Sequence, residues 1–222
     1  MAEHRKIPEH EAIYRRIRDA ILFGALAPGQ GVTIQGLARM IGAGMTPVRE
    51  AIRRLTSEGA LQTMDNRRIA IPRLTPGQCE ELRLARIALE PKLAEMAAEK
   101  APAGLVDDLV ALDGALNDAL SGGAVEGYLC HNYRFHFRLY DAAQAHILTA
   151  IAQTLWLRAG PSLRVVCDRL DTMALPDMHL RAIRAIRNGD ARAAGQAIAD
   201  DIHQGMDQIR GALETPAPPK GD

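Results

Sequence analysis

The run TPVREAIRRLTSEGAL constrains the fold of this chain more than any other part of the sequence. Thr46 and Pro47 suit the cap and the first position of a helix, and Gly59 suits its end. Apolar residues recur at i, i+3, i+4 and i+7 and so share one face: Val48, Ala51, Ile52 and Leu55. Arg49 and Arg53 lie four residues apart on the other side. The run therefore predicts a short helix with one buried face and one cationic face.

A second short helix is predicted just before this one. Thr33 suits its cap, and the same apolar period is carried by Ile34, Leu37, Ala38 and Ile41. Glycines at 42 and 44 mark a tight connection, and two short helices joined by such a turn form a helix-turn-helix. Farther upstream, a first helix that ends near Gly24 is indicated by Ile13, Ile17, Ala20 and Ile21.

Two short strands are predicted to follow the helix that carries Arg49 and Arg53. Residues 61–64 and 68–71 flank an Asp65-Asn66 turn, which is the pattern of a hairpin. Residues 8–74 therefore predict a winged helix-turn-helix domain with a two-stranded wing. In such a domain the recognition helix and the wing reach nucleic acid, so the expected contacts are Thr46, Arg49, Arg53, Arg67 and Arg68.

The distribution of charge agrees with a polyanionic partner for this first part. Residues 1–75 hold 12 Lys plus Arg against 7 Asp plus Glu, whereas residues 76–222 hold 15 against 20. The formal net charge of zero therefore combines a basic N-terminal part, the head, with an acidic C-terminal part, the body. The alternative is that the three helices form only a small packing unit and that the arginines are a solvated face.

The rest of the chain predicts an all-helical bundle of six or seven helices over residues 76–213. Proline and glycine punctuate an Ala- and Leu-rich helical pattern at spacings suited to a bundle. The expected helices cover 76–100 with a kink at Pro91, 103–120, 124–143, a stretch from 145 interrupted by Gly160-Pro161, a helix opened by Pro176, and one capped by Asp190. The Pro-rich residues 214–222 predict a disordered tail.

The three cysteines, Cys79, Cys130 and Cys167, are odd in number and lack CxxC spacing, so they indicate neither a disulfide framework nor a thiolate zinc site. A reducing cytoplasm is the expected location. No uninterrupted apolar run approaches the roughly 20 residues of a membrane helix, so no membrane association is expected.

Polar residues with metal-ligand chemistry recur along the predicted bundle. Asn132 and His136 are four apart and share one helical face, while His179 and His203 come from the two final helices. Three imidazoles that converge in a helical interior would suit zinc or nickel, with an amide oxygen or water completing the coordination. The alternative is that each histidine is merely hydrogen-bonded or exposed.

The chain resembles the GntR family of bacterial transcription regulators, and within it the FadR subfamily with its FCD ligand-binding domain. The head matches through ILFGALAPGQGV, LARMIGAGMTPVREAIRRLTSEGAL and NRRIAI. The body matches through LRLARIALEPKLAEMAAE, HNYRFHFRLYDAA, PDMHLRAIRAIRNGDARAA and DDIHQGM. The resemblance implies a homodimer that binds a palindromic DNA operator, acts as a repressor, and responds to a small organic acid.

The resemblance also implies roles for individual residues. Metal-containing relatives use an aspartate four residues before a histidine, together with two later histidines; His136, His179 and His203 match these histidines, and Asn132 stands in place of the aspartate. Arg86 matches an arginine that points toward the effector pocket, although a salt bridge with Glu90 is an equal alternative.

Two other functions stay open at this point. One is a metal-dependent helical enzyme, in which three histidines leave a position for activated water. No acidic residue is placed as a general base and the HExxH pattern is absent, so the chain is expected not to be an enzyme. The other is a regulator whose metal is purely structural or absent.

Overall fold

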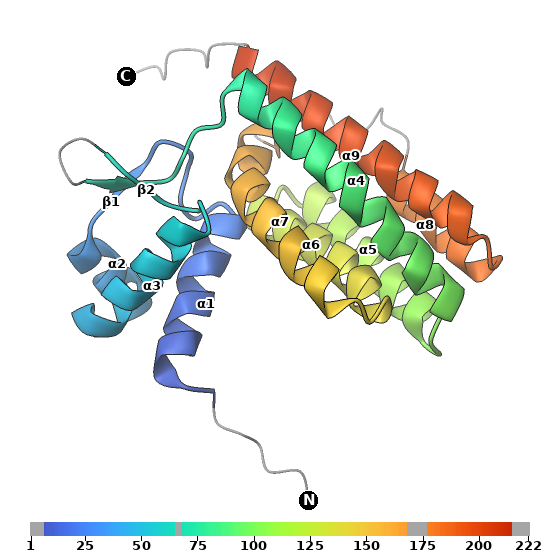
Figure 1. Ribbon diagram of the computed structural model, residues 1–222, viewed down its shortest axis with the longest axis horizontal. Helices are drawn as coiled ribbons and strands as arrows, with labels where there is room; N and C mark the ends of the chain where they lie inside the picture. The colour runs from blue at the N-terminus through green and yellow to red at the C-terminus, as the bar shows by residue number, and fades with distance from the viewer. Residues whose placement is uncertain (1–6, 65–67, 168–176, 215–222) are drawn as a thin grey trace, which may run out of the picture.

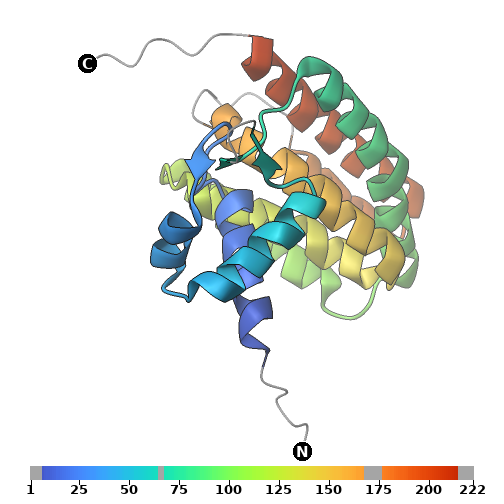
Figure 2. The same ribbon diagram turned by 60° about the vertical axis from the view of Figure 1, so that its left-hand side comes forward.

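The computed structural model describes residues 7–64, 68–167 and 177–214. Within them the chain forms a small head, residues 8–74, and a helical bundle, residues 76–214 (Figure 1). The head lies against one end of the bundle, beside α7 (His146–Cys167), in both ribbon views (Figures 1 and 2). A mainly helical chain with a winged head is the fold class that the sequence predicts.

The head contains the three predicted helices, α1 (Glu9–Leu22), α2 (Ile34–Ile41) and α3 (Met45–Ser57). Every apolar residue that the sequence places on the inner face of α3 is buried, and the Thr33 hydroxyl caps α2 by accepting from the amide of Gly36. The cap of α3 differs from the prediction, because Gly44 is the capping residue and Thr46 lies inside the first turn. Pro47 is tolerated there because the first amides of a helix have no partner within it.

The small sheet has three strands rather than the two predicted. Strands β2 (Gln62–Thr63) and β3 (Ile69–Ala70) form the predicted antiparallel wing, and β1 (Gly31–Val32) pairs with the other edge of β3. A two-residue strand has too few positions to show an alternating pattern, which is why β1 has no sequence signal. The Asp65-Asn66 turn and Arg67 lie outside the described residues.

The described part of the bundle has six helices, as predicted: α4 (Pro76–Lys100), α5 (Leu105–Ser121), α6 (Val125–Ala142), α7, α8 (Met178–Arg187) and α9 (Ala191–Glu214). A capping box between Thr75 and Gln78 begins α4, which then continues through Pro91 as one helix. Helix α9 runs beside α4 along the face of the bundle (Figure 1).

Two predicted boundaries in the bundle are corrected by the structure. Helix α7 is not interrupted at Gly160-Pro161, because Gly160 packs against the end of α1: a Cβ there would lie 3.2 Å from the carbonyl oxygen of Leu22. Tertiary packing outweighs the hydrogen bond that Pro161 cannot make. Helix α8 begins at Met178 with Asp177 as its cap, and Pro176 lies outside the described residues.

Helix α9 begins after Asp190, as predicted, and includes Glu214, which the sequence analysis assigned to the tail. The other residues of the predicted tail, 215–222, lie outside the described part. None of the described helices combines the length and apolarity that a bilayer span requires.

Candidate functional site

The exposed face of α3 is the first candidate site. Arg49 and Arg53 project from the side opposite to the buried stripe and are both exposed. Arg53 forms a solvent-exposed ion pair with Glu50, in which Nη1 and Oε2 are 3.2 Å apart, whereas Arg49 has no ion pair with any described residue. Exposed ion pairs are weak, so both guanidinium groups are available to a polyanion.

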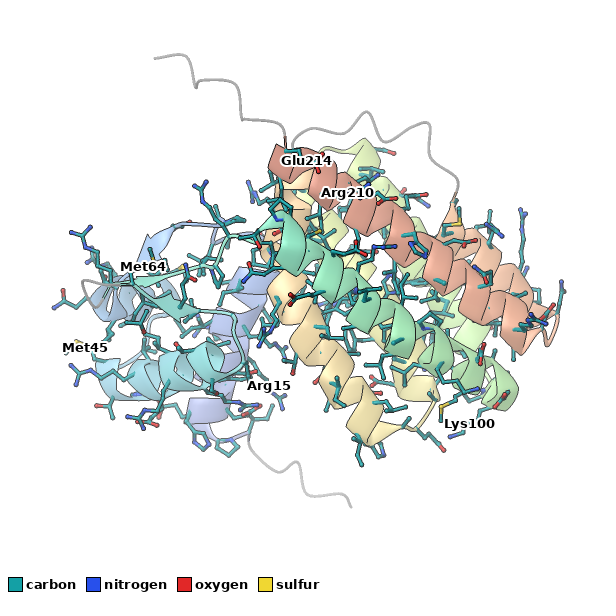
Figure 3. All side chains as sticks on the ribbon, turned by 45° about the horizontal axis from the view of Figure 1, so that its top comes forward. Arg15, Met45, Met64, Lys100, Arg210 and Glu214 are labelled. Atoms are coloured by element: carbon teal, nitrogen blue, oxygen red, sulfur yellow. The ribbon has the colours of Figure 1, made fainter. Side chains whose placement is uncertain are left out.

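This face lies at the outer edge of the head. Met45 begins α3 and Met64 follows β2, and Figure 3 shows both at the end of the molecule farthest from the bundle. Thr46 is exposed in the first turn of α3, and Arg68 is exposed just before β3. The start of α3 and the end of β2 therefore both lie at the end of the head that is away from the bundle.

A buried cluster of His136, His179 and Asp201 is the second candidate site. The three side chains come from α6, α8 and α9, and their ligand atoms all lie within 4.8 Å of one another. The two Nε2 atoms are 3.2 Å apart, His136 Nε2 is 3.3 Å from Asp201 Oδ2, and His179 Nε2 is 3.7 Å from Asp201 Oδ1. His136 is 0% exposed and Asp201 is 23% exposed, so the cluster opens toward solvent on the Asp201 side.

Hydrogen bonds behind the two histidines fix which ring nitrogen faces the cluster. Tyr140 donates its hydroxyl proton to Glu90 over 2.7 Å, so His136 Nδ1, 3.1 Å from the same hydroxyl, must be the donor of that pair. His179 Nδ1 donates to Asp113 over 3.2 Å. In the neutral rings both Nε2 lone pairs then point at each other, and this arrangement is favourable only when a proton or a metal ion lies between them.

The donor set and its spacing fit a divalent metal ion. Ligand atoms about 2.0–2.2 Å from a shared tetrahedral zinc lie about 3.3–3.6 Å apart, and the separations in this cluster match that range closely. Two imidazoles and a carboxylate are also a ligand set that zinc accepts, and both rings have the outer hydrogen-bond partners typical of metal-binding histidines.

The charges in the cluster are strongly coupled. Burial lowers the pKa of His136. Burial also opposes charging of His179, but the hydrogen bond to Asp113 and the charge of Asp201 outweigh it and raise the pKa of that ring. Burial disfavours the Asp201 carboxylate, yet both histidines and Arg86 lower its pKa to about 2. Asp201 is therefore an anion facing two imidazoles.

The structure brings together only two of the four metal ligands predicted from the sequence. His203 lies on the other flank of α9, where its Nδ1 is 3.0 Å from Nη1 of Arg83. Asn132 is half-buried one turn before His136, and its amide makes no hydrogen bond to the described residues. Asp201 thus occupies the place that the sequence analysis gave to His203.

Arg86 and Glu90 form a salt bridge in the interior, with Nε and Oε1 2.7 Å apart. Glu90 also accepts from the indole of Trp156 over 2.9 Å and from Tyr140, and the guanidinium lies 4.5 Å from the centre of the Trp156 ring. The sequence analysis gave Arg86 two possible roles, an effector contact or a salt bridge with Glu90. The salt bridge is present, and it lies in the interior instead of on the surface.

Helix α7 joins this buried network to the head. Arg158 donates from Nε to the carbonyl of Glu58 over 3.2 Å, and Arg164 donates from Nη1 to the carbonyl of Gly24 over 2.8 Å. These carbonyls lie at the C-terminal ends of α3 and α1, where cations are favoured. Two arginines of one helix therefore hold two helices of the head.

Comparison with known proteins agrees with both parts of this architecture. Residues 9–71 match the family described as bacterial regulatory proteins, gntR family, and residues 81–204 match the FCD domain. The chain belongs to the GntR family, in its FCD-containing group. It is therefore a transcription regulator with a GntR-type head and an FCD body.

Several relatives share this organisation over most of their length. The chain is 26% identical to the HTH-type transcriptional regulator McbR of Escherichia coli over 194 residues, 86% of this chain and 87% of that protein. It is 28% identical to the uncharacterized HTH-type transcriptional regulator YdhC of Bacillus subtilis, over 93% of each. Among solved structures, E. coli McbR/YncC has a TM-score of 0.84 at 24% identity, over 91% of this chain and 97% of that chain, which shows a shared fold.

Within the FCD body, the sequence analysis missed Asp201 although the residue lies only two positions before His203. Successive residues on a helix are about 100° apart, so these two fall on opposite flanks of the buried stripe. The flank of Asp201 is marked by the small buried residues Ala194 and Ala197, which face the interior. That burial pattern is the signal that could have selected Asp201.

We expect Glu90→Ala to lower the free energy of unfolding by about 3–5 kcal/mol, because it leaves Arg86 charged and unpaired in the interior. Glu99→Ala, at an exposed position on the same helix, is the matched control and should change stability by less than about 0.5 kcal/mol. Urea unfolding at one fixed protein concentration measures both. Equal stability of the two variants would show that the buried pair does not stabilise the bundle.

Proposed function

We propose that this GntR-family regulator is a cytoplasmic homodimeric repressor whose operator affinity is controlled by a small carboxylate bound near a metal ion in the FCD domain. The observation that carries the proposal is the combination of a free cationic helix face on the head with a buried His-His-Asp cluster in the body. Three cysteines without disulfide bonds accord with a reducing compartment.

The head supports DNA binding through α3 and the wing. With Arg49 and Arg53 exposed on the outer face, α3 has the length and charge to enter a major groove, where arginine reads guanine edges and contacts phosphate. Thr46 and Arg68 are exposed in the first turn of α3 and just before β3, and we retain them with Arg67 as contact candidates. A palindromic operator then follows from the two-fold symmetry of a dimer.

The buried cluster supports metal binding by His136, His179 and Asp201. We place Asp201, instead of His203, in the ligand set, and keep the Asn132 amide as a further candidate. A zinc or nickel ion bound there supplies a Lewis-acid centre that attracts a carboxylate. The protein contributes two oriented imidazoles, one anionic oxygen ligand and a partly open side at Asp201.

Helix α7 provides a physical route from this cluster to the head. On the bundle side, Trp156 and Tyr140 both donate to Glu90, and the Tyr140 hydroxyl also contacts Nδ1 of His136. On the head side, Arg158 and Arg164 hold the ends of α3 and α1. A ligand that shifts the packing around Glu90 therefore displaces the helix on which the head rests, and so changes the position of the recognition helix.

An apolar surface on α4 and α7 supports dimerisation. Ile147 is 79% exposed, and Ile151 and Leu84 are also exposed on these neighbouring helices. Ala85 and Leu155 line a groove beside Ile151. Large apolar side chains that cluster on a surface mark protein contacts, and a self-complementary patch produces a two-fold dimer.

Arg49→Ala should weaken operator binding by about ten- to a hundredfold, because it removes a guanidinium from the recognition face. The operator would be obtained by capturing genomic DNA fragments from the source organism on the purified protein and sequencing them. The control is Arg192→Ala, an exposed arginine on the bundle, which should capture the same fragments.

Unchanged affinity for Arg49→Ala would overturn the assignment of the recognition helix. An operator complex that responds to no small carboxylate, in metal-loaded and metal-free protein alike, would contradict effector control instead.

Asp201→Ala should lower metal affinity by more than about tenfold, whereas His203→Ala should retain the metal, because only Asp201 lies beside the two Nε2 atoms. Metal content after dialysis and the melting-temperature shift on adding a chelator report this directly. Metal loss in His203→Ala with retention in Asp201→Ala would restore the ligand set predicted from the sequence.

Ile151→Glu should convert the dimer to a monomer at micromolar concentration, since it places a charge in an apolar contact. Val110→Glu, at an exposed apolar position on α5, is the control and should leave the mass unchanged. Light scattering coupled to size-exclusion chromatography measures both masses. A dimer that tolerates Ile151→Glu must use another surface.

A further inference from the structure

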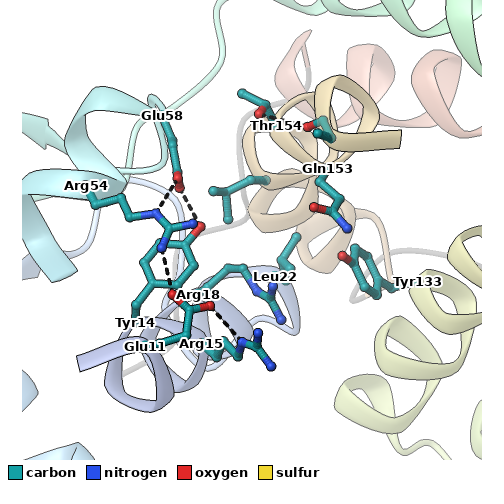
Figure 4. Close-up of a pocket in the computed structure, with 12 residues that line it drawn as sticks. Glu11, Tyr14, Arg15, Arg18, Leu22, Arg54, Glu58, Tyr133, Gln153 and Thr154 are labelled. Atoms are coloured by element: carbon teal, nitrogen blue, oxygen red, sulfur yellow. Dashed lines mark hydrogen bonds and ion pairs between the residues drawn. The ribbon is translucent and has the colours of Figure 1, made fainter. Parts of the chain in front are cut away.

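A pocket of about 490 Å³ lies at the junction of the head and the bundle (Figure 4). Its walls come from α1 and α3 on the head side and from α6 and α7 on the bundle side. The volume is in the range of small-molecule sites, which often lie between domains. None of the residues that line it belongs to the recognition face or to the histidine cluster, so it is a separate feature of the molecule.

One wall is the polar face of α1. Glu11, Arg15, Arg18 and Leu22 recur at i, i+4, i+7 and i+11, while the opposite face buries Ile13, Ile17 and Ile21 in the core of the head. The polar face of α1 faces the side chains of α6 and α7 across the pocket (Figure 4).

The acidic groups of this wall are already occupied by partners within the head. Glu58 accepts from Arg54 and from the hydroxyl of Tyr14, and Glu11 accepts from Arg54 and Arg15. Arg54 also lies over the Tyr14 ring, 3.6 Å from its centre. The carboxylates therefore form one internal network and offer little attraction to a cationic ligand.

Two arginines of the same wall keep free hydrogen-bond donors. Arg15 uses only Nε for Glu11, which leaves both terminal nitrogens, and Arg18 uses Nε and Nη2 for Asp19, which leaves Nη1. Figure 4 shows both guanidinium groups on the side of α1 that faces Gln153 and Tyr133. Free guanidinium donors bind carboxylate and phosphate oxygens strongly.

The bundle wall adds neutral polar groups. The Tyr133 hydroxyl and the Gln153 amide have no hydrogen-bond partner in the described part of the chain. Burial raises the pKa of Tyr133 to about 12, so its hydroxyl is a neutral donor. The Tyr133 ring is held in place by stacking on Phe137 and by an edge contact with Phe23 of the head.

We propose that the junction pocket binds a small organic anion whose carboxylate or phosphate oxygens accept from Arg15 and Arg18 and whose uncharged part reaches Tyr133 and Gln153. Asp19 and the two glutamates balance the charge of the three arginines, but the groups left free in the lining are mostly donors, so the pocket favours an acceptor-rich anion over a cation. Leu22 and Leu157 supply an apolar surface for a short carbon skeleton.

Such a ligand touches the head and the bundle at once. It adds to the two hydrogen bonds by which Arg158 and Arg164 hold the head, and so favours this orientation over any other. The site is independent of the effector position proposed beside the histidine cluster, because the two share no residue.

The test is isothermal titration calorimetry of the full-length protein with inorganic phosphate, glucose 6-phosphate and succinate, each in chloride buffer of matched ionic strength. At least one probe should bind with a dissociation constant below roughly 1 mM. Arg18→Gln should weaken that binding by about tenfold or more, and Tyr133→Phe, which removes only the hydroxyl, by several-fold. Arg192→Gln should have no effect, and Asp201→Ala should also retain the binding.

Each other outcome overturns the proposal. Absence of binding by all three probes removes the site. Loss of binding in Asp201→Ala, with retention in Arg18→Gln, places the anion at the histidine cluster. Weakening by Arg18→Gln but not by Tyr133→Phe places it on the head alone, without the bridge to the bundle. Circular dichroism and melting curves of each variant separate these results from unfolding.

Discussion

The buried carboxylate of Glu90 is the constraint on which the rest of the bundle depends. A charged group in the interior is costly unless donors surround it, and here the donors come from Arg86, Tyr140 and Trp156. These residues belong to α4, α6 and α7, so one carboxylate fixes three helices relative to each other. It also determines, through Tyr140, which nitrogen His136 turns toward the histidine cluster.

Helix α7 extends this constraint to the other half of the molecule. The indole of Trp156 donates to Glu90 inside the bundle, and Gly160 allows α7 to approach α1 closely. Arg158 and Arg164 donate to backbone carbonyls at the ends of α3 and α1. Gly24 and Gly59 leave room for these arginine side chains because they have no Cβ: a Cβ would lie 2.5 Å from Cδ of Arg164 at Gly24 and 2.7 Å from Cζ of Arg158 at Gly59. Both glycines also have positive φ, a conformation that glycine adopts without strain. The head is thus attached through specific polar contacts, and such contacts can be rearranged at modest cost.

Local periodicity was sufficient to predict the helices, because their apolar faces repeat with the helical period. The bounds of α4, Pro76–Lys100, coincide with the prediction, and the buried face of α3 is the predicted one. What local pattern could not predict depends on contacts between distant segments. The continuity of α7 through Pro161 depends on α1, the strand β1 depends on β3, and the choice of Asp201 over His203 depends on which flank of α9 faces α8.

The position of Trp156 has a consequence for how this regulator can be observed. It is the only tryptophan of the chain, and its ring lies 4.8 Å from the centre of the His136 ring while its N–H donates to Glu90. All indole emission therefore arises from one site, beside the histidine cluster and on the helix that touches the head. Its wavelength and intensity depend on local charge and hydrogen bonding, so the molecule carries an intrinsic optical probe where its two halves communicate.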